Sequence, residues 1–259
     1  TWQQKTEGLP NLEKTGRIGL SLCASRPNVI YAFVDNHNPG RMPREGERDA
    51  YGRIKTGRVI KGAEVYRTDD NAETWVKVSP DDRYMEGFGG TYGWVFGQIR
   101  VDPSDPDTVY IMGLRLSQSK DGGKTWKTLY YDGLHGDHHG LWIDPENSDY
   151  LINVNDGGVN ISYDQGVTWR DFHTIHPIVQ FYNVAYDMAK PFNVYGSVQD
   201  HGTYKGNVAH GLPRSRREPR PITYWEAAPG GEGTHVAVDP RNPNLTYSSS
   251  FYGRLMRSE

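Results

Sequence analysis

Short runs of apolar, β-branched and aromatic residues follow one another along the whole chain, and each run is bounded by Asp, Asn, Gly or Pro. The clearest set predicts four strands, over residues 139–143, 150–154, 158–162 and 168–172. Runs of this length between turn-forming residues are typical of strands joined by tight turns. The pattern therefore predicts an all-β fold made of repeated four-stranded units, whose strands we call A to D.

One motif, S/T-x-D-x-G-x-T-W, recurs at the expected turn between strands C and D. Its three copies occupy residues 68–75, 119–126 and 162–169. The aspartate and tryptophan of these copies are Asp70 and Trp75, Asp121 and Trp126, and Asp164 and Trp169. The aspartate can accept backbone N–H groups across a tight turn, the glycine can adopt a positive φ, and the tryptophan can pack between units. We therefore interpret these residues as structural.

A second motif, an apolar strand followed by Asp-Pro, marks the turn between strands A and B. Its aspartates are Asp102, Asp144 and Asp239, with a weaker copy at Asp187. In chain order these aspartates lie 42, 43 and 52 residues apart, a period that matches a four-stranded propeller blade. The sequence thus predicts a single β-propeller segment over residues 1–259, with about five antiparallel blades. Their approximate bounds are 2–75, 76–126, 127–169, 170–225 and 226–259, the last blade being incomplete.

Both ends of the chain match parts of the first motif. Thr1 and Trp2 match its end, and residues 257–259 match its beginning. This favours a piece of a larger ring of about six to eight blades, with the rest of a parent chain or a second propeller or domain as its partner. In the alternative, residues 2–5 supply the missing strand of the last blade and close a five-bladed ring.

The charge and cysteine content exclude several classes of function. The chain has 29 Lys and Arg against 32 Asp and Glu, and a formal net charge of -3, which gives no electrostatic footprint for nucleic acid or an anionic membrane. It has no run of about 18 apolar residues, so we expect no membrane span. Its one cysteine, Cys23, excludes an internal disulfide but not secretion by a bacterium.

The loops that do not carry the two motifs predict where chemistry takes place. If the A–B and C–D turns share one rim, the B–C and D–A loops share the other, and propeller ligands bind where such loops converge. Six of the nine histidines fall in these loops, namely His37, His135, His138, His173, His176 and His201. His135, Asp137 and His138 have the donor types for Zn²⁺ or another divalent metal ion, the one cofactor that the sequence suggests. In the alternative, these side chains stabilise tight loops through backbone hydrogen bonds.

Two acidic residues occupy equivalent B–C positions in neighbouring blades. Asp156 and Asp200 could flank a glycosidic bond as base and acid if their carboxylates lie about 5 to 9 Å apart, and the alternative is a structural role at a tight turn. Candidate ligand-binding residues on the same rim are Tyr92, Trp94, Asn155, Gln199 and His201. The two aromatic residues belong to a glycine-rich segment whose rings could stack on sugars or pack between blades.

Three sequence segments carry a family resemblance, namely G-D-H-H-G-L-W-I-D-P at 136–145, N-D-G-G-V at 155–159 and V-Q-D-H-G at 198–202. With the repeated turn motif, they resemble the BNR (Asp-box) repeat propellers, and in particular large bacterial exported proteins of the glycosyl hydrolase, xyloglucanase-like or sortilin-like type. The resemblance implies a β-propeller, an extracytoplasmic location (periplasmic, cell-surface or secreted) and a glycan or protein ligand. N-D-G-G is one residue shorter than the R-T-D-x-G-G motif of family 74 endoglucanases and lacks its arginine.

The sequence supports three functional hypotheses. The first is an exported binding module that recognises a glycan or protein at the B–C and D–A rim. The second is a glycoside hydrolase acting as a xyloglucanase-like endo-β-glucanase, with Asp156 and Asp200 as its acid and base and its cleft completed by a second propeller. The third is a propeller stabilised by a metal and without activity of its own.

Overall fold

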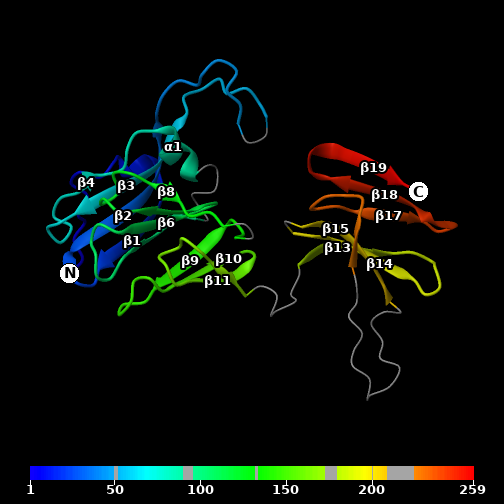
Figure 1. The fold of residues 1–259 in the computed structure, drawn as a ribbon. Coiled ribbons are helices and arrows are strands. Elements are labelled where there is room, and N and C mark those ends of the chain that lie inside the picture. Colours follow the sequence, from blue (N-terminus) through cyan, green and yellow to red (C-terminus); the bar gives the residue numbers. More distant parts are fainter. Residues whose placement is uncertain (50–51, 90–95, 132–133, 173–179, 200, 209–224) are drawn as a thin grey trace. The chain divides into compact units, whose positions relative to one another are not determined.

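The structure is a computed structural model that describes residues 1–49, 52–89, 96–131, 134–172, 180–199, 201–208 and 225–259. Its strands form five antiparallel sheets, which we number 1 to 5 in chain order (Figure 1). Sheet 1 contains β1 (Thr15–Cys23), β2 (Arg26–Pro39), β3 (Ile60–Thr68) and β4 (Val76–Lys77). Sheet 2 contains β5 (Gln98–Val101), β6 (Val109–Met112), β7 (Leu116–Ser119) and β8 (Lys127–Thr128). Sheet 3 contains β9 (His138–Ile143), β10 (Leu151–Asn155), β11 (Gly158–Ser162) and β12 (Arg170–Asp171).

The remaining strands form two further sheets. Sheet 4 contains β13 (Phe181–Tyr186), β14 (Asn193–Val198), β15 (Gly202–Asn207) and β16 (Trp225–Ala228). Sheet 5 contains β17 (Val236–Asp239), β18 (Asn242–Ser250) and β19 (Arg254–Ser258). Short 3-10 helices precede β1 (η1, Leu12–Lys14) and β19 (η4, Phe251–Gly253). In every sheet the strands follow one another in sequence order and pair antiparallel.

The predicted all-β fold with blade-like antiparallel sheets is confirmed. In sheet 3 the strands lie where the hydrophobic pattern places them, except that the fourth strand shortens to the two residues of β12. Among the described residues, no helix is long and apolar enough to cross a membrane.

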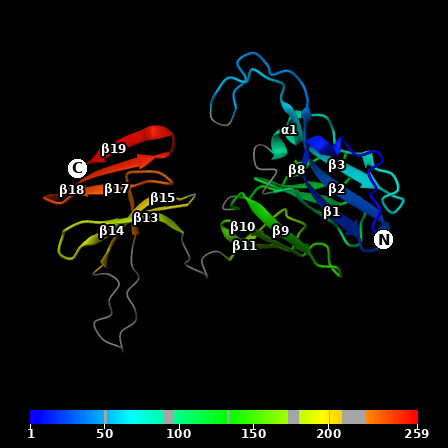
Figure 2. The ribbon, with the colours of Figure 1, turned by 180° about the vertical axis from the view of Figure 1, so that it is seen from behind.

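The chain forms two compact units, Thr1–His176 with sheets 1 to 3 and Pro177–Glu259 with sheets 4 and 5. Within the first unit, β1 lies against β5 and β5 lies against β9, so the first strands of successive sheets are neighbours (Figures 1 and 2). Within the second unit, β13 and β17 have the same relation. This is the order in which propeller blades pack.

Two apolar clusters hold the sheets of the first unit together. The cluster between sheets 1 and 2 is formed around Tyr31, Val65 and Ile99, and the cluster between sheets 2 and 3 is formed around Met112 and Leu151. All five side chains have no exposed surface. Because burying one such side chain stabilises a fold by about 1.5–3 kcal/mol, these clusters fix the order of the sheets.

One short helix, α1 (Arg83–Gly89), lies in the connection from sheet 1 to sheet 2 and differs from the loop that the sequence predicts. It begins after Asp82, whose Oδ1 accepts the backbone N–H of Met85 at 2.9 Å, an N-terminal cap. Met85 and Phe88 are three residues apart, share one face of the helix and are buried against sheet 1. The helix therefore forms because a polar cap and a two-residue apolar face occur together.

The three S/T-x-D-x-G-x-T-W turns, called aspartate turns below, are held by one hydrogen-bond scheme. In the third copy, Asp164 Oδ1 accepts the N–H of Thr168 at 2.8 Å and Oδ2 accepts its hydroxyl at 2.6 Å. Ser162 donates to Asp164 at 2.8 Å and accepts the N–H of Gly166 at 2.8 Å. Asp121 and Asp70 bind Thr125 and Thr74 in the same way. In each copy, one carboxylate and one hydroxyl thus accept hydrogen bonds from the backbone N–H groups of the turn.

The first aspartate turn differs from the other two at its fifth position. Trp126 and Trp169 donate their indole N–H to the carbonyls of Gly123 and Gly166 at 2.9 and 3.1 Å. The equivalent residue of the first copy is Ala72, which has a φ of 69°, and the buried Nε1 of Trp75 has no hydrogen-bond partner among the residues that the structure describes. A left-handed backbone is costly for alanine but not for glycine, so this copy is strained.

The two edges of the first unit carry different connections. At one, the turn edge, each aspartate turn bonds to the A–B turn of its own sheet, for example Gln165 N–H to Asp149 O at 3.1 Å and Gly122 N–H to Asp107 O at 2.9 Å. At the other, the loop edge, His138 N–H donates to Gly113 O at 2.9 Å, which joins the start of β9 to the β6–β7 turn. The loop edge therefore gathers the B–C and D–A connections of sheets 1 to 3.

The aspartate turns predict a stability loss in acid. The hydroxyls of Thr68 and Thr74 and the backbone N–H of Thr74 lower the pKa of Asp70 from 3.8 to about 2. The folded state therefore binds fewer protons than the unfolded chain, and the contribution of Asp70 to the free energy of unfolding is complete above about pH 4 and is lost as the pH falls towards 2. Urea unfolding at pH 6 and pH 3 should show a smaller loss for Asp70→Asn than for the wild type. Asp149→Asn, with an exposed carboxylate on the same edge, should keep the wild-type loss, and an equal effect of both variants would contradict the assignment.

The strain at Ala72 predicts a stabilising substitution. Ala72→Gly should raise the free energy of unfolding by about 0.5–1 kcal/mol, since the relief of left-handed strain outweighs the backbone entropy of glycine. Gly166→Ala should do the opposite, because its φ is 85° and an added Cβ would lie 2.6 Å from Leu129 Cδ1. Urea unfolding of both variants at pH 7 checks the pair, and a destabilising Ala72→Gly would refute this account.

Candidate functional site

A network of buried amide and imidazole groups crosses sheet 3 at the loop edge. His138 Nδ1 lies 2.8 Å from Asn153 Oδ1, and Asn155 Nδ2 donates to Asn153 Oδ1 at 3.0 Å and to Asn160 Oδ1 at 2.7 Å. Asn160 in turn donates to Asp171. The network has members on β9, β10, β11 and β12, and Asn153 at its centre has no exposed surface. Buried polar groups paired in this way fix the strands in one arrangement.

This network determines the shape of the two-residue turn from β10 to β11. Asn155 Oδ1 accepts the N–H of Gly157 at 2.9 Å, an Asx turn. Both polar ends of the Asn155 side chain are therefore occupied within the sheet. The predicted ligand-binding residue Asn155 instead positions its neighbour, Asp156, at the tip of the turn.

Asp156 lies beside two residues from other elements. Its Oδ1 is 2.7 Å from His139 Nε2, and the side chains of Asp156 and His139 are 34% and 44% exposed. The His139 ring packs against Phe96, with 5.3 Å between ring centroids and a tilt of 42°. Phe96 belongs to the segment before β5, so sheets 2 and 3 both contribute. The result is an exposed carboxylate–imidazole pair on an aromatic ring, which we call the Asp156 site.

The chemistry of the Asp156 site suits a hydroxylated ligand. If His139 donates its Nε2 proton to Asp156, its Nδ1 remains an acceptor when the ring is neutral and becomes a donor when it is charged. Asp156 Oδ2 accepts no hydrogen bond from any residue that the structure describes. The site therefore offers acceptors for hydroxyl groups, and the exposed His139 ring, which packs on the buried Phe96, can contact an apolar surface.

The structure does not group His135, Asp137 and His138 as a set of metal ligands. His138 is turned into the sheet, where burial lowers its pKa and its Nδ1 donates to Asn153 Oδ1. His135 Nδ1 lies 3.1 Å from the Gly136 carbonyl, and Asp137 has a left-handed backbone with φ 58°. In the described part of the chain, no three His, Cys, Asp or Glu side chains are grouped so that they could hold an ion.

Several predicted residues cannot be compared with the structure. Asp200, Tyr92 and Trp94 lie outside the described residues. Gln199 and His201 belong to the β14–β15 turn of the second unit, where His201 Nδ1 lies 2.8 Å from the Gln199 carbonyl. The pairing of Asp156 with Asp200 therefore stays a prediction.

His139 and Phe96 are absent from the candidates that the sequence provides. Successive residues of a strand point to opposite faces, so the adjacent histidines of β9 divide into the buried His138 and the exposed His139. That alternation could have indicated His139. No comparable signal marks Phe96, because its contact with His139 joins residues 43 positions apart on different sheets.

The buried network predicts a coupled loss of stability. Asn153→Ala should lower the free energy of unfolding by about 2 kcal/mol, because the buried His138 and the half-buried Asn155 lose their shared acceptor. Together with His138→Ala, the double variant should lose less than the sum of the two single losses, by about 1 kcal/mol. Urea unfolding of the four proteins measures this coupling, and additive losses would contradict the bond between these side chains.

Comparisons with known proteins add a relationship in sequence. No protein-family model matches the chain. In an alignment of 186 residues, the chain is 31% identical to the xyloglucanase Xgh74A of Acetivibrio thermocellus, and the match covers 63% of this chain and 21% of that enzyme. The chain thus spans about a fifth of the length of the curated relative that it matches.

Solved structures with a similar arrangement of strands have lower identity. The GH74 enzyme of Niastella koreensis is 15% identical with a TM-score of 0.40, covering 89% of this chain and 33% of the enzyme. The GH74 xyloglucanase of Xanthomonas campestris is 17% identical with a TM-score of 0.40, covering 93% and 36%. YCF48 of Cyanidioschyzon merolae is 13% identical with a TM-score of 0.38, covering 92% and 65%. In sequence, this all-β chain is therefore similar to a xyloglucanase of the GH74 class over nearly two thirds of its length.

Proposed function

We propose that this chain is part of a larger exported, Asp-box-type propeller protein that binds a β-glucan-type polysaccharide at its loop edge. The observation that carries the proposal is the Asp156 site, an exposed carboxylate and imidazole beside an aromatic ring. Its context is a chain that aligns over 186 residues with a xyloglucanase. An extracytoplasmic location of the parent protein belongs to the proposal, since such polysaccharides lie outside the cell.

The contacts at the Asp156 site fit the two faces of a glucan chain. A pyranose ring has an apolar C–H face that packs on an aromatic edge or face, and the exposed ring of His139, supported from below by the buried Phe96, provides one. Its hydroxyls are donors, and Asp156 Oδ2 is an acceptor that the described residues leave unused. Because the buried network holds the β10–β11 turn, this acceptor is oriented before the ligand arrives, which lowers the entropic cost of binding.

Hydrolysis is a second candidate function, favoured by one specific observation. Asp156 is a partly exposed carboxylate held by an imidazole, and glycoside hydrolysis uses a pair of carboxylic acids. We propose Asp156 as one member of such a pair, with Asp200 as the other. A second propeller or domain of the parent protein would complete the cleft.

Binding of xyloglucan oligosaccharides to the full chain tests the first proposal. Asp156→Asn and His139→Ala should each weaken binding by about tenfold, since each removes about one hydrogen bond or ring contact. Phe96→Ala should weaken it as well, because the His139 ring loses the buried side chain that supports it. Isothermal titration calorimetry measures the affinities. Asp149→Asn changes an exposed aspartate on the turn edge of the same sheet and should bind like the wild type.

The same proteins separate binding from hydrolysis. Release of reducing ends from xyloglucan by the wild type and by Asp149→Asn, with none from Asp156→Asn, would support the enzymatic role. If Asp156→Asn binds as tightly as the wild type, the Asp156 site is not where the polysaccharide binds.

A further inference from the structure

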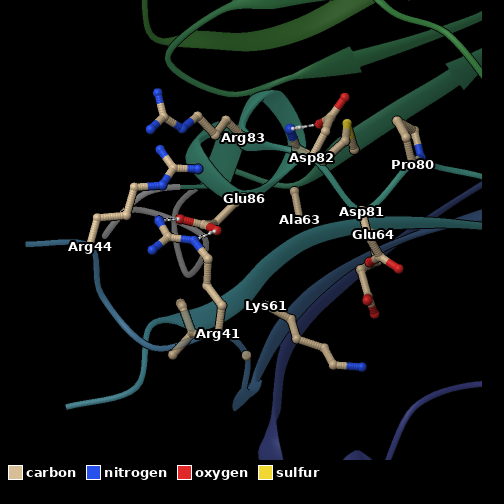
Figure 3. A pocket seen from close by; sticks show the side chains of 13 residues that line it. Arg41, Arg44, Lys61, Ala63, Glu64, Pro80, Asp81, Asp82, Arg83 and Glu86 are labelled. Carbon is tan, nitrogen blue, oxygen red and sulfur yellow. Dashed lines mark hydrogen bonds and ion pairs between the residues drawn. The ribbon is translucent and has the colours of Figure 1, made fainter. Parts of the chain in front are cut away.

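A cavity of about 330 Å³ opens in the first unit beside sheet 1, away from the Asp156 site. Its walls come from the start of the insertion between β2 and β3, from β3 itself and from the segment that begins α1 (Figure 3). Its volume is at the lower end of the range for small-molecule sites. Eight of its lining residues are charged, namely Arg41, Arg44, Lys61, Glu64, Asp81, Asp82, Arg83 and Glu86.

Arg41 makes the wall of the cavity rigid. It donates to both carboxylate oxygens of Glu86 at 2.8 and 2.7 Å and to both of Glu47 at 2.7 and 3.0 Å. A further hydrogen bond reaches the Met42 carbonyl at 3.0 Å, so all five N–H groups of the guanidinium are used. The hydrogen bonds from Arg41 and Lys55 lower the pKa of Glu47 to about 2. Arg41 therefore ties the insertion to α1 and has no donor left for a ligand.

Most of the acidic groups around the cavity are also neutralised. Lys77 lies 2.8 Å from Glu64 and is paired with Asp81 as well. Glu86 is paired with Arg41. Asp82 accepts the N–H of Met85 as the cap of α1 and has no ion pair with a described residue. Asp82 thus has no cation among the described residues, and Glu64 and Asp81 share the single charge of Lys77.

Three cations of the lining remain without an anion. The side chains of Arg44, Lys61 and Arg83 have neither a hydrogen bond nor an ion pair with any residue that the structure describes. Figure 3 shows the guanidinium groups of Arg44 and Arg83 on the same side of the cavity, with Lys61 on the β3 side. The lining has four cations and four carboxylates, and with the ion-pair partners Glu47, Lys55 and Lys77 the group carries a surplus of one positive charge.

The position of Arg83 makes this surplus costly for the free protein. Arg83 is the first residue of α1, where the helix dipole favours an acidic side chain over a basic one. The Arg44 guanidinium lies on the same side of the cavity (Figure 3), so the two like charges also repel each other. An anion between them would relieve both effects, and guanidinium groups bind carboxylate and sulfate oxygens with two parallel hydrogen bonds.

We propose that this cavity binds the carboxylate or sulfate group of an acidic sugar, with Arg44 and Arg83 as its main donors and Lys61 as a further cation. The anionic group is assigned from the unpaired cations of the cavity. The sugar rests on the proposed function, because the cavity and the Asp156 site belong to the same unit of one chain. The ligand class is therefore a uronic acid or a sulfated saccharide.

Calorimetric titration of the full chain with D-glucuronate at low salt tests the site. Arg83→Glu and Arg44→Ala should each weaken glucuronate binding by at least tenfold, and added NaCl should weaken it in the wild type. Lys124→Ala removes an exposed cation from an aspartate turn of sheet 2 and should leave the affinity unchanged. Arg83→Glu should not unfold the protein, because glutamate suits the first turn of a helix, and its thermal midpoint checks this.

Titrations with other ligands identify which part of the acidic sugar is bound. D-Glucose should not bind, and sodium sulfate should bind more weakly than glucuronate. A wild type that does not bind glucuronate, or an Arg83→Glu variant that binds it equally well, would overturn the site. Sulfate binding as tight as that of glucuronate would overturn its assignment to a sugar. Asp156→Asn should keep the glucuronate affinity while losing that for xyloglucan, so failures of this site and of the Asp156 site give different results.

Discussion

The first unit depends on the carboxylate of each aspartate turn. The outer strands β4, β8 and β12 contain only two residues each, so strand pairing cannot hold the turn that leads into them. In all three copies the aspartate accepts the N–H and the hydroxyl of the threonine four residues later. These bonds replace the missing strand ladder and place the following tryptophan against the core. Sheets with such narrow edges are stable because their last turn is held by side chains rather than by backbone.

Because the turn edge holds the sheets together, the loops at the loop edge can differ in length and sequence. The turn edge is occupied by hydrogen bonds between the A–B and C–D turns of each sheet, so its sequence is constrained by the fold. At the loop edge, sheet 3 has a turn of two residues, whereas sheet 1 has the segment 40–59 at the equivalent place. Different sheets can therefore carry different chemistry on the same scaffold.

The sequence predicts those features of the fold that are formed by residues close to one another along the chain. Strand positions in sheet 3 and the three aspartate turns depend on neighbours within about ten residues, and the motif spacing was sufficient to predict them. The contact of His139 with Phe96 and the ion pair of Arg41 with Glu86 join residues 43 and 45 positions apart, and no local pattern encodes such pairs. The metal hypothesis depended on donor types along the chain, whereas strand alternation directs the His138 side chain into the sheet, where it bonds to Asn153.

The two sites of the first unit show how loop length decides the kind of support a site receives. A two-residue turn loses little entropy on ordering, and one amide, Asn155, is enough to orient Asp156. The segment 40–59 loses far more, and the structure holds it with charged hydrogen bonds from Arg41 to Glu47 and Glu86. Charge-assisted bonds are about twice as strong as neutral ones, which suits the longer segment. All N–H groups of the Arg41 side chain are therefore hydrogen-bonded within the protein. An anion that enters the cavity must be bound by the cations that have no such partner among the described residues, Arg44, Lys61 and Arg83.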